Sequence, residues 1–182
     1  MREILTIKLD EIDSTQDLAR DIIKNGTADK YDGVVITAKK QFAGRGQKGS
    51  LWSSEKGGLY ISIIRKTDEE KLSEIQYISY KTAQILLELL HEKYGIRLKI
   101  KKPNDIYAWD GKRYRKISGI LIETTPHNNK RYIIIGIGVN FTNPIPMKLK
   151  SKAVNLFEIT SKRYNPKSLE KKLVEKIFQI EI

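Results

Sequence analysis

The sequence predicts an α+β fold in which helices pack mainly on one face of a mixed β-sheet. Several short runs of β-branched and aromatic residues indicate strands, and longer segments with apolar residues at helical spacing indicate helices. Neither an internal repeat nor a low-complexity linker interrupts the 182 residues. A chain of that length suits one hydrophobic core, so we expect a single domain over residues 1–182.

Predicted strands and helices alternate along the first half of the chain. Ile4–Leu9 alternates apolar and polar residues, as a half-buried strand does. Ser14–Thr15 precedes apolar residues at helical spacing, which predicts an N-cap and a short helix that ends at Asn25–Gly26. Val34–Ala38 and Leu59–Ile64 are predicted strands on either side of a glycine-rich loop.

The second half of the chain continues the same pattern. The longest helix is predicted to begin at Asp68 and to end at Gly95, because apolar residues trace one face between them. Asp110–Gly111 separates two short apolar runs and predicts a hairpin turn. Tyr132–Ile137 is nearly all apolar, which places it near the centre of the sheet. The remaining predicted elements are strands at Leu98–Lys101, Ile106–Trp109 and Ile117–Glu123 and a helix at Leu169–Ile180.

The charge balance bounds the kind of partner. Lysine and arginine number 34 against 22 aspartates and glutamates, which leaves a formal net charge of +12. Such an excess suits a polyanion, such as nucleic acid, the phosphates of ATP or an acidic protein. The lysines are dispersed along the chain, however, and a surface rich in lysine and glutamate is also typical of adaptation to heat.

The remaining composition excludes several kinds of site. The chain has no cysteine, and its two histidines are His91 and His127, so we expect no disulfides and no metal site built from protein ligands. The N-terminal residues lack the apolar region of a signal peptide, and no apolar run approaches membrane-spanning length. We therefore expect a cytoplasmic protein that does not contact a membrane.

The segment Gln41–Trp52 is the strongest local signal. It contains Gly44, Gly46 and Gly49, together with two cations and a tryptophan. Glycines let a backbone approach phosphates closely, and a tryptophan offers a flat face to a planar base. A strand follows this loop, whereas a dinucleotide-binding fold requires a helix there. The segment therefore predicts a nucleotide site of another kind, with a ligand-free glycine hairpin as the alternative.

Six motifs that follow one another along the chain resemble the catalytic domain of biotin–protein ligases. The motifs are Asp13–Gln16, Gln41–Trp52, Gly57–Ser62, Lys101–Asp105, Lys116–Glu123 and Gly136–Asn140. Each motif alone is weak, but all six in this order are specific and cover nearly all of residues 4–180. The resemblance implies the fold shared by class II aminoacyl-tRNA synthetases and biotin–lipoyl ligase catalytic domains.

The resemblance also implies an activity. The family joins biotin to ATP, giving biotinyl-5′-adenylate and pyrophosphate, and then transfers biotin to a lysine of a carboxylase carrier domain. Mg²⁺ is expected to accompany ATP. The expectation rests on the reaction alone, because no motif in the sequence points to metal ligands. The partner would be a biotin carboxyl carrier protein or domain, and its docking would use the basic surface.

Site residues follow from the resemblance, position by position. It assigns biotin binding to Ser14, Thr15, Gln16, Gln41, Gly44, Arg45, Gly46, Gln47, Lys101 and Gly119. It assigns binding of ATP or the adenylate to Arg45, Lys48, Trp52, Asn104, Lys116 and Asn140. Lys101 and Arg45 are the expected catalytic residues, because a cation is needed between the carboxylate and the α-phosphate. The alternatives are a helix cap for Ser14, a surface lysine for Lys101 and a structural tryptophan for Trp52.

The chain departs from the family pattern in two motifs. Gln47 stands where the family's Gly-Arg-Gly-Arg has its second arginine, which predicts weaker retention of the adenylate unless Lys48 compensates. Lys102 stands where the family usually has tryptophan between lysine and proline, which removes apolar packing at that position.

Three further expectations concern function and assembly. We expect no specific DNA binding, because no helix-turn-helix precedes the first strand. We also expect no small β-barrel after the last helix. A homodimer is compatible with the sequence. The alternatives are a lipoate–protein ligase of the same superfamily and a non-enzymatic basic nucleic-acid-binding module. An octanoyltransferase is disfavoured, because such enzymes rely on a cysteine nucleophile.

Overall fold

The computed structural model describes residues 3–67 and 75–182, and its strands form one seven-stranded sheet in the order β1-β2-β3-β7-β6-β5-β4. β1 runs parallel to β2, and the other neighbouring pairs are antiparallel, so the predicted mixed sheet is confirmed. The strands are β1 (Ile4–Ile12), β2 (Gly33–Gln41), β3 (Leu59–Thr67), β4 (Leu98–Lys101), β5 (Asp105–Trp109), β6 (Tyr114–His127) and β7 (Lys130–Val139). The α-helices are α1 (Thr15–Lys24), α2 (Ile75–Tyr94), α3 (Leu156–Thr160) and α4 (Lys167–Phe178).

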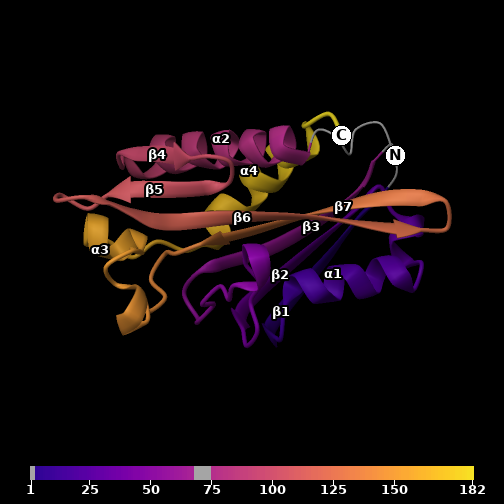
Figure 1. Cartoon of the computed structure of the whole chain (residues 1–182), viewed down its shortest axis with the longest axis horizontal. Coiled ribbons are helices and arrows are strands. Elements are labelled where there is room, and N and C mark those ends of the chain that lie inside the picture. The colour runs from indigo at the N-terminus through magenta and orange to yellow at the C-terminus, as the bar shows by residue number, and fades with distance from the viewer. Residues whose placement is uncertain (1–2, 68–74) are drawn as a thin grey trace.

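Both faces of the sheet are covered. Successive residues of the central strands point to opposite faces, so Ile63 joins one apolar cluster and Ile64 the other. The larger cluster lies under α2 and α4, in agreement with the predicted packing of helices mainly on one face. On the opposite face, α1 covers the smaller cluster. Figure 1 shows α2 and α4 on one side of the sheet and α1 on the other.

Local hydrogen bonds explain where the helices begin and end. Ser14 is the N-cap of α1, and its Oγ accepts from the backbone N–H groups of Gln16 and Asp17. Gly26 follows with a φ of 76°, in the left-handed region where glycine ends a helix readily. Gly95 ends α2 in the same way, with a φ of 65°. The predicted start of that helix at Asp68 lies outside the described residues.

Two hairpin turns lie at opposite ends of β6, one between β5 and β6 and the other between β6 and β7. In the turn between β5 and β6, Asp110 Oδ1 accepts from the backbone N–H groups of Lys112 and Arg113, each at 2.8 Å. These backbone donors, aided by Arg115, lower the pKa of Asp110 from 3.8 to about 2. β6 and β7 extend beyond their predicted ends, because Asn128–Asn129 adopts positive φ angles and closes a tight two-residue turn.

The segment between β7 and α4 holds the short helix α3, which the sequence did not predict. Asn155 caps it by accepting from Glu158 N at 2.8 Å. No helix among residues 3–67 and 75–182 is long and apolar enough to cross a membrane.

Candidate functional site

A cavity of about 290 Å³ opens where the start of α1 and the glycine-rich loop meet the sheet. Its floor is formed by β3, β6 and β7, and its rim by the loop between β2 and β3. The predicted site residues that line it are Ser14, Thr15, Gln16, Gln41, Arg45, Gly46, Gln47, Trp52, Asn104, Lys116 and Gly119. The fold therefore gathers in one place residues that are up to about a hundred positions apart in the sequence.

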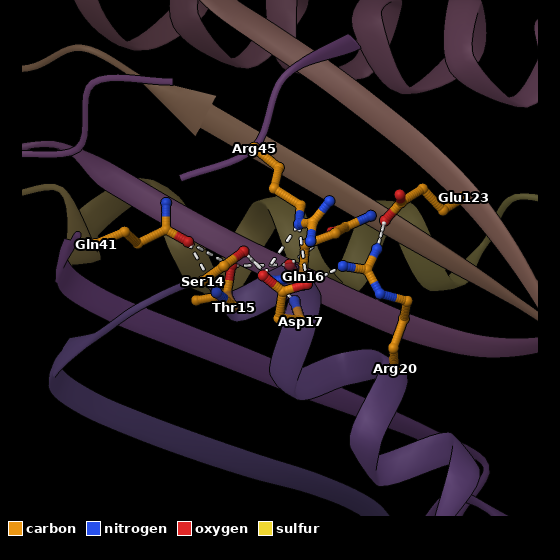
Figure 2. Close-up of polar contacts among 9 residues, drawn as sticks. Ser14, Thr15, Gln16, Asp17, Arg20, Gln41, Arg45 and Glu123 are labelled. Atoms are coloured by element: carbon orange, nitrogen blue, oxygen red, sulfur yellow. Dashed lines mark hydrogen bonds and ion pairs between the residues drawn. The ribbon is translucent and has the colours of Figure 1, made fainter. Parts of the chain in front are cut away.

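Hydroxyl and amide groups form a connected network on one part of the lining (Figure 2). Gln41 Oε1 accepts from Thr15 N at 2.8 Å and from Thr15 Oγ1 at 3.0 Å, and Gln41 Nε2 donates to Ser54 Oγ at 2.8 Å. Ser62 Oγ lies 2.9 Å from Thr15 Oγ1 and donates to Gln16 Oε1 at 2.9 Å. Gln16 Nε2 is buried without a hydrogen-bond partner among the described residues, so it is a donor available to a ligand.

Three glycines make room on the floor of the cavity. A Cβ at Gly138 would lie 2.5 Å from the Trp52 ring, and one at Gly119 would lie 3.1 Å from it. A Cβ at Gly136 would lie 2.6 Å from Gln16 Oε1. Trp52 therefore lies directly against the backbone of β6 and β7, and its buried Nε1 has no hydrogen-bond partner among the described residues.

Two cations reach the lining. Arg45 donates from Nε to Asp17 Oδ2 at 3.0 Å. Lys116 Nζ lies 2.7 Å from Asp105 Oδ1 and 5.2 Å from the centroid of the Trp52 ring. Both cations thus border a cavity with a flat aromatic wall, which is an arrangement suited to an anion joined to a planar base.

Lys101 does not line the cavity, contrary to its predicted place beside the reacting groups. Its side chain is exposed, and its Nζ lies 5.6 Å from the centroid of the Tyr107 ring. β4 is an edge strand of the sheet, and Lys101 pairs there with Asp105, which itself pairs with Gly119 of β6. Lys101 is therefore one strand farther from the cavity than Asp105.

Three other predicted residues also lie outside the lining. Asn140 is buried, accepts from Asn143 Nδ2 at 3.0 Å and donates to Val154 O at 3.3 Å, so both ends of its amide serve the segment after β7. Lys48 is exposed and borders a neighbouring hollow of about 380 Å³. Gly44 is buried, and a Cβ there would lie 2.5 Å from Ser54 Oγ.

The structure adds residues that the sequence did not assign to the site. Ser62 and Asp105 line the cavity, as do Gly136 and Gly138. Ser62 belongs to the motif Gly57–Ser62, Asp105 to Lys101–Asp105 and both glycines to Gly136–Asn140, but none of the four had been assigned a role in the site. Among residues 3–67 and 75–182, no three His, Cys, Asp or Glu side chains gather as a metal site.

The sequence is similar to those of known proteins. Residues 9–140 match the model of the biotin/lipoate A/B protein ligase family. The chain is 33% identical over 159 residues to the bifunctional ligase/repressor BirA of Bacillus subtilis, covering 85% of this chain and 46% of that protein. It is 33% identical over 119 residues to the human biotin–protein ligase, covering 63% of this chain and 16% of that protein.

Solved structures show the same likeness. The Aquifex aeolicus biotin protein ligase in complex with biotin and ATP matches with a TM-score of 0.77 and 30% identity, over 96% of this chain and 69% of that one. The Leishmania major enzyme in complex with biotinyl-5-AMP matches with a TM-score of 0.73 and 27% identity, over 96% and 74%. By contrast, this chain spans about half the length of the Bacillus relative.

Proposed function

This chain belongs to the biotin/lipoate A/B protein ligase family, and from that premise we propose that it is an ATP-dependent biotin–protein ligase. Residues 1–182 would act as a single catalytic domain that forms biotinyl-5′-adenylate and transfers biotin to a lysine of a carrier domain. The observation that carries the proposal is one cavity in which a neutral hydroxyl–amide network stands beside two cations and an aromatic wall.

The hydroxyl–amide network suits the ureido ring of biotin. That ring is uncharged and offers one carbonyl oxygen and two N–H groups, so it needs short neutral donors and acceptors. Gln16 Nε2 supplies an unused donor, and the hydroxyls of Ser14, Thr15 and Ser62 are all buried beside it. Specificity for biotin over a ligand without these polar groups would follow, because the network would otherwise lose its partners.

The cations suit the first chemical step. A carboxylate oxygen of biotin attacks the α-phosphorus of ATP, the bond to the β-phosphate breaks, and pyrophosphate leaves. Both reactants are anionic, so a preorganised cation lowers the barrier. We propose that Lys116 and Arg45 supply this charge, with Lys116 taking the part that the sequence assigned to Lys101, because Lys116 reaches the cavity. Trp52 would stack on the adenine.

The second step needs less from the protein. The ε-amine of the carrier lysine attacks the acyl carbon, the bond between that carbon and the AMP oxygen breaks, and the amine loses a proton. AMP leaves as an anion, which Arg45 and Lys116 would continue to stabilise.

Mg²⁺ is proposed as the ion that accompanies ATP, where it would neutralise phosphate charge when bound. Mg²⁺ keeps much of its coordination to phosphates and water and needs one or two protein carboxylates. Asp105 is a carboxylate on the lining, paired there with Lys116 at 2.7 Å, and it is the residue that would hold such an ion.

Calorimetry with biotin, with and without ATP, and biotin-dependent exchange of pyrophosphate into ATP test the proposal. We expect biotin binding in the cavity and exchange that requires biotin. Exchange that proceeds with lipoate and not with biotin would assign the chain to the lipoate branch of the family instead. Tight binding of duplex DNA without either exchange would support the nucleic-acid-binding module.

The partner and the compartment are also part of the proposal. A biotin carboxyl carrier protein or carboxylase carrier domain is the proposed acceptor, and the cytoplasm is the proposed compartment, without membrane contact or specific DNA binding. Analytical ultracentrifugation with and without biotin and ATP would distinguish a monomer from the homodimer that the sequence allows.

A further inference from the structure

Arg45 contacts α1 through the Nε of its guanidinium group. The Nε of Arg45 lies 2.9 Å from Asp17 Oδ1 and 3.0 Å from Oδ2. Figure 2 draws Arg45 joined to Asp17 by dashed lines. Within residues 3–67 and 75–182, no hydrogen bond uses the two terminal nitrogens of Arg45. The guanidinium is therefore held by its side, and the fork at its end is left for another acceptor.

Asp17 is itself fixed from two directions. It lies in the first turn of α1, where its backbone N–H donates to Ser14 Oγ and where the helix dipole favours a carboxylate. One terminal nitrogen of Arg20 also donates to Asp17, and the other donates to Glu123 Oε2 of β6 at 2.7 Å. Successive ion pairs thus link β6 and α1 to the glycine-rich loop, in the order Glu123, Arg20, Asp17 and Arg45.

The loop is also tied to the chain before α1, because Phe42 N donates to Ile12 O at 3.0 Å and Ala43 N donates to Asp13 O at 2.8 Å. Its internal bonds include Gly46 N to Ser50 O at 2.7 Å, and Trp52 N donates to Gly44 O at 2.8 Å. These bonds shape the loop but do not fix the direction of the Arg45 side chain. The Arg45 and Asp17 side chains are 48% and 35% exposed, so their ion pair contributes little to stability. Its effect is on orientation.

We propose that Asp17 is a positioning residue for Arg45. It would hold the guanidinium by Nε so that the two terminal nitrogens meet the anionic part of the ligand, the biotin carboxylate or the α-phosphate of ATP, as a ready two-pronged donor. The inference rests on the proposed function, because it names the ligand of that same cavity. Asp17 lies outside the glycine-rich motif, and neither its sequence position nor its charge had marked it as part of the site.

A double-mutant cycle tests this role in the full chain. Asp17→Asn removes the charge, and Asp21→Asn makes the same change at an exposed position of the same helix. We expect Asp17→Asn to lower kcat/KM for biotin-dependent pyrophosphate exchange by about tenfold, as for a misplaced reacting group, and Asp21→Asn to leave it unchanged. In an Arg45→Gln background, Asp17→Asn should cause no further loss, because a residue that acts through Arg45 has nothing left to position.

Amide hydrogen exchange of residues 44–50 without ligand gives a readout that does not depend on activity. We expect faster exchange in Asp17→Asn and wild-type exchange in Asp21→Asn, because the first variant releases the loop from α1. Wild-type protein with no pyrophosphate exchange would overturn the proposed function, and the amide exchange would still test the contact. Wild-type kcat/KM in Asp17→Asn, or an equal loss in the Arg45→Gln background, would overturn the positioning role.

Discussion

Lys116 and Lys101 show how the surroundings of one ammonium group decide its role. Each lysine belongs to one of the motifs found in the sequence. Lys116 borders the cavity, whereas Lys101 lies on the edge strand β4, over the ring of Tyr107. We expect Lys116→Ala to reduce biotin-dependent pyrophosphate exchange by roughly a hundredfold, as for the loss of a preorganised charge-stabilising donor. Lys101→Ala is the matched control and should retain activity near that of the wild type. The reverse order of the two variants would restore the assignment made from sequence.

Asp110 makes a separate prediction about pH. Its pKa falls from 3.8 to about 2 because the folded turn donates to its charged form. A lowered pKa contributes stability above the unfolded value, and this contribution is lost as pH falls from about 3.8 through about 2. We expect the Asp110 carboxyl resonance to titrate near pH 2 in NMR spectra. Asp110→Asn should flatten the pH dependence of the free energy of unfolding in that window, and an unchanged slope would contradict the lowered pKa.

At the scale of elements, the glycine-rich loop carries the departure at Gln47. Gln47 lines the cavity, whereas Lys48 borders the neighbouring hollow, so we expect that Lys48 does not replace the missing arginine. We expect Gln47→Arg to slow the release of biotinyl-adenylate by about tenfold, as for one added charge-assisted hydrogen bond. Rapid-mixing measurements of the off-rate test this, with Lys48→Ala as the control that should leave it unchanged. A faster off-rate in Lys48→Ala would show that Lys48 compensates after all.

The elements themselves were largely predictable, because each depends on local signals. Ser14 as N-cap, Gly95 as helix end and Asp110–Gly111 as turn all act within a few residues. The sequence missed α3, whose N-cap Asn155 is fixed by contacts with Asn143, twelve positions earlier. It also missed Lys101's distance from the cavity, since the cavity floor forms where β3 pairs with β7, a contact between distant segments.

At the scale of the whole molecule, the charge of +12 has a kinetic consequence. A basic surface speeds the approach of an acidic carrier, and salt screens this attraction over a Debye length of about 8 Å at 0.15 M. We expect the association rate of the carrier to fall as salt rises, while the affinity for free biotin, held mainly by neutral ureido contacts, changes much less. Stopped-flow association and calorimetry across a salt series would measure both. An association rate independent of salt would remove steering from the account.

The position of Trp52 gives the molecule a built-in optical reporter. The chain has two tryptophans: Trp52 lines the cavity, whereas Trp109, the last residue of β5, packs against Tyr114 of β6. A ligand that enters the cavity changes the polarity around one indole and leaves the other as it was. In a Trp109→Phe variant, the whole of the intrinsic tryptophan fluorescence would then come from the site, so occupancy could be followed without a label. If saturating biotin and ATP leave the fluorescence emission spectrum of that variant unchanged, neither ligand approaches the Trp52 indole.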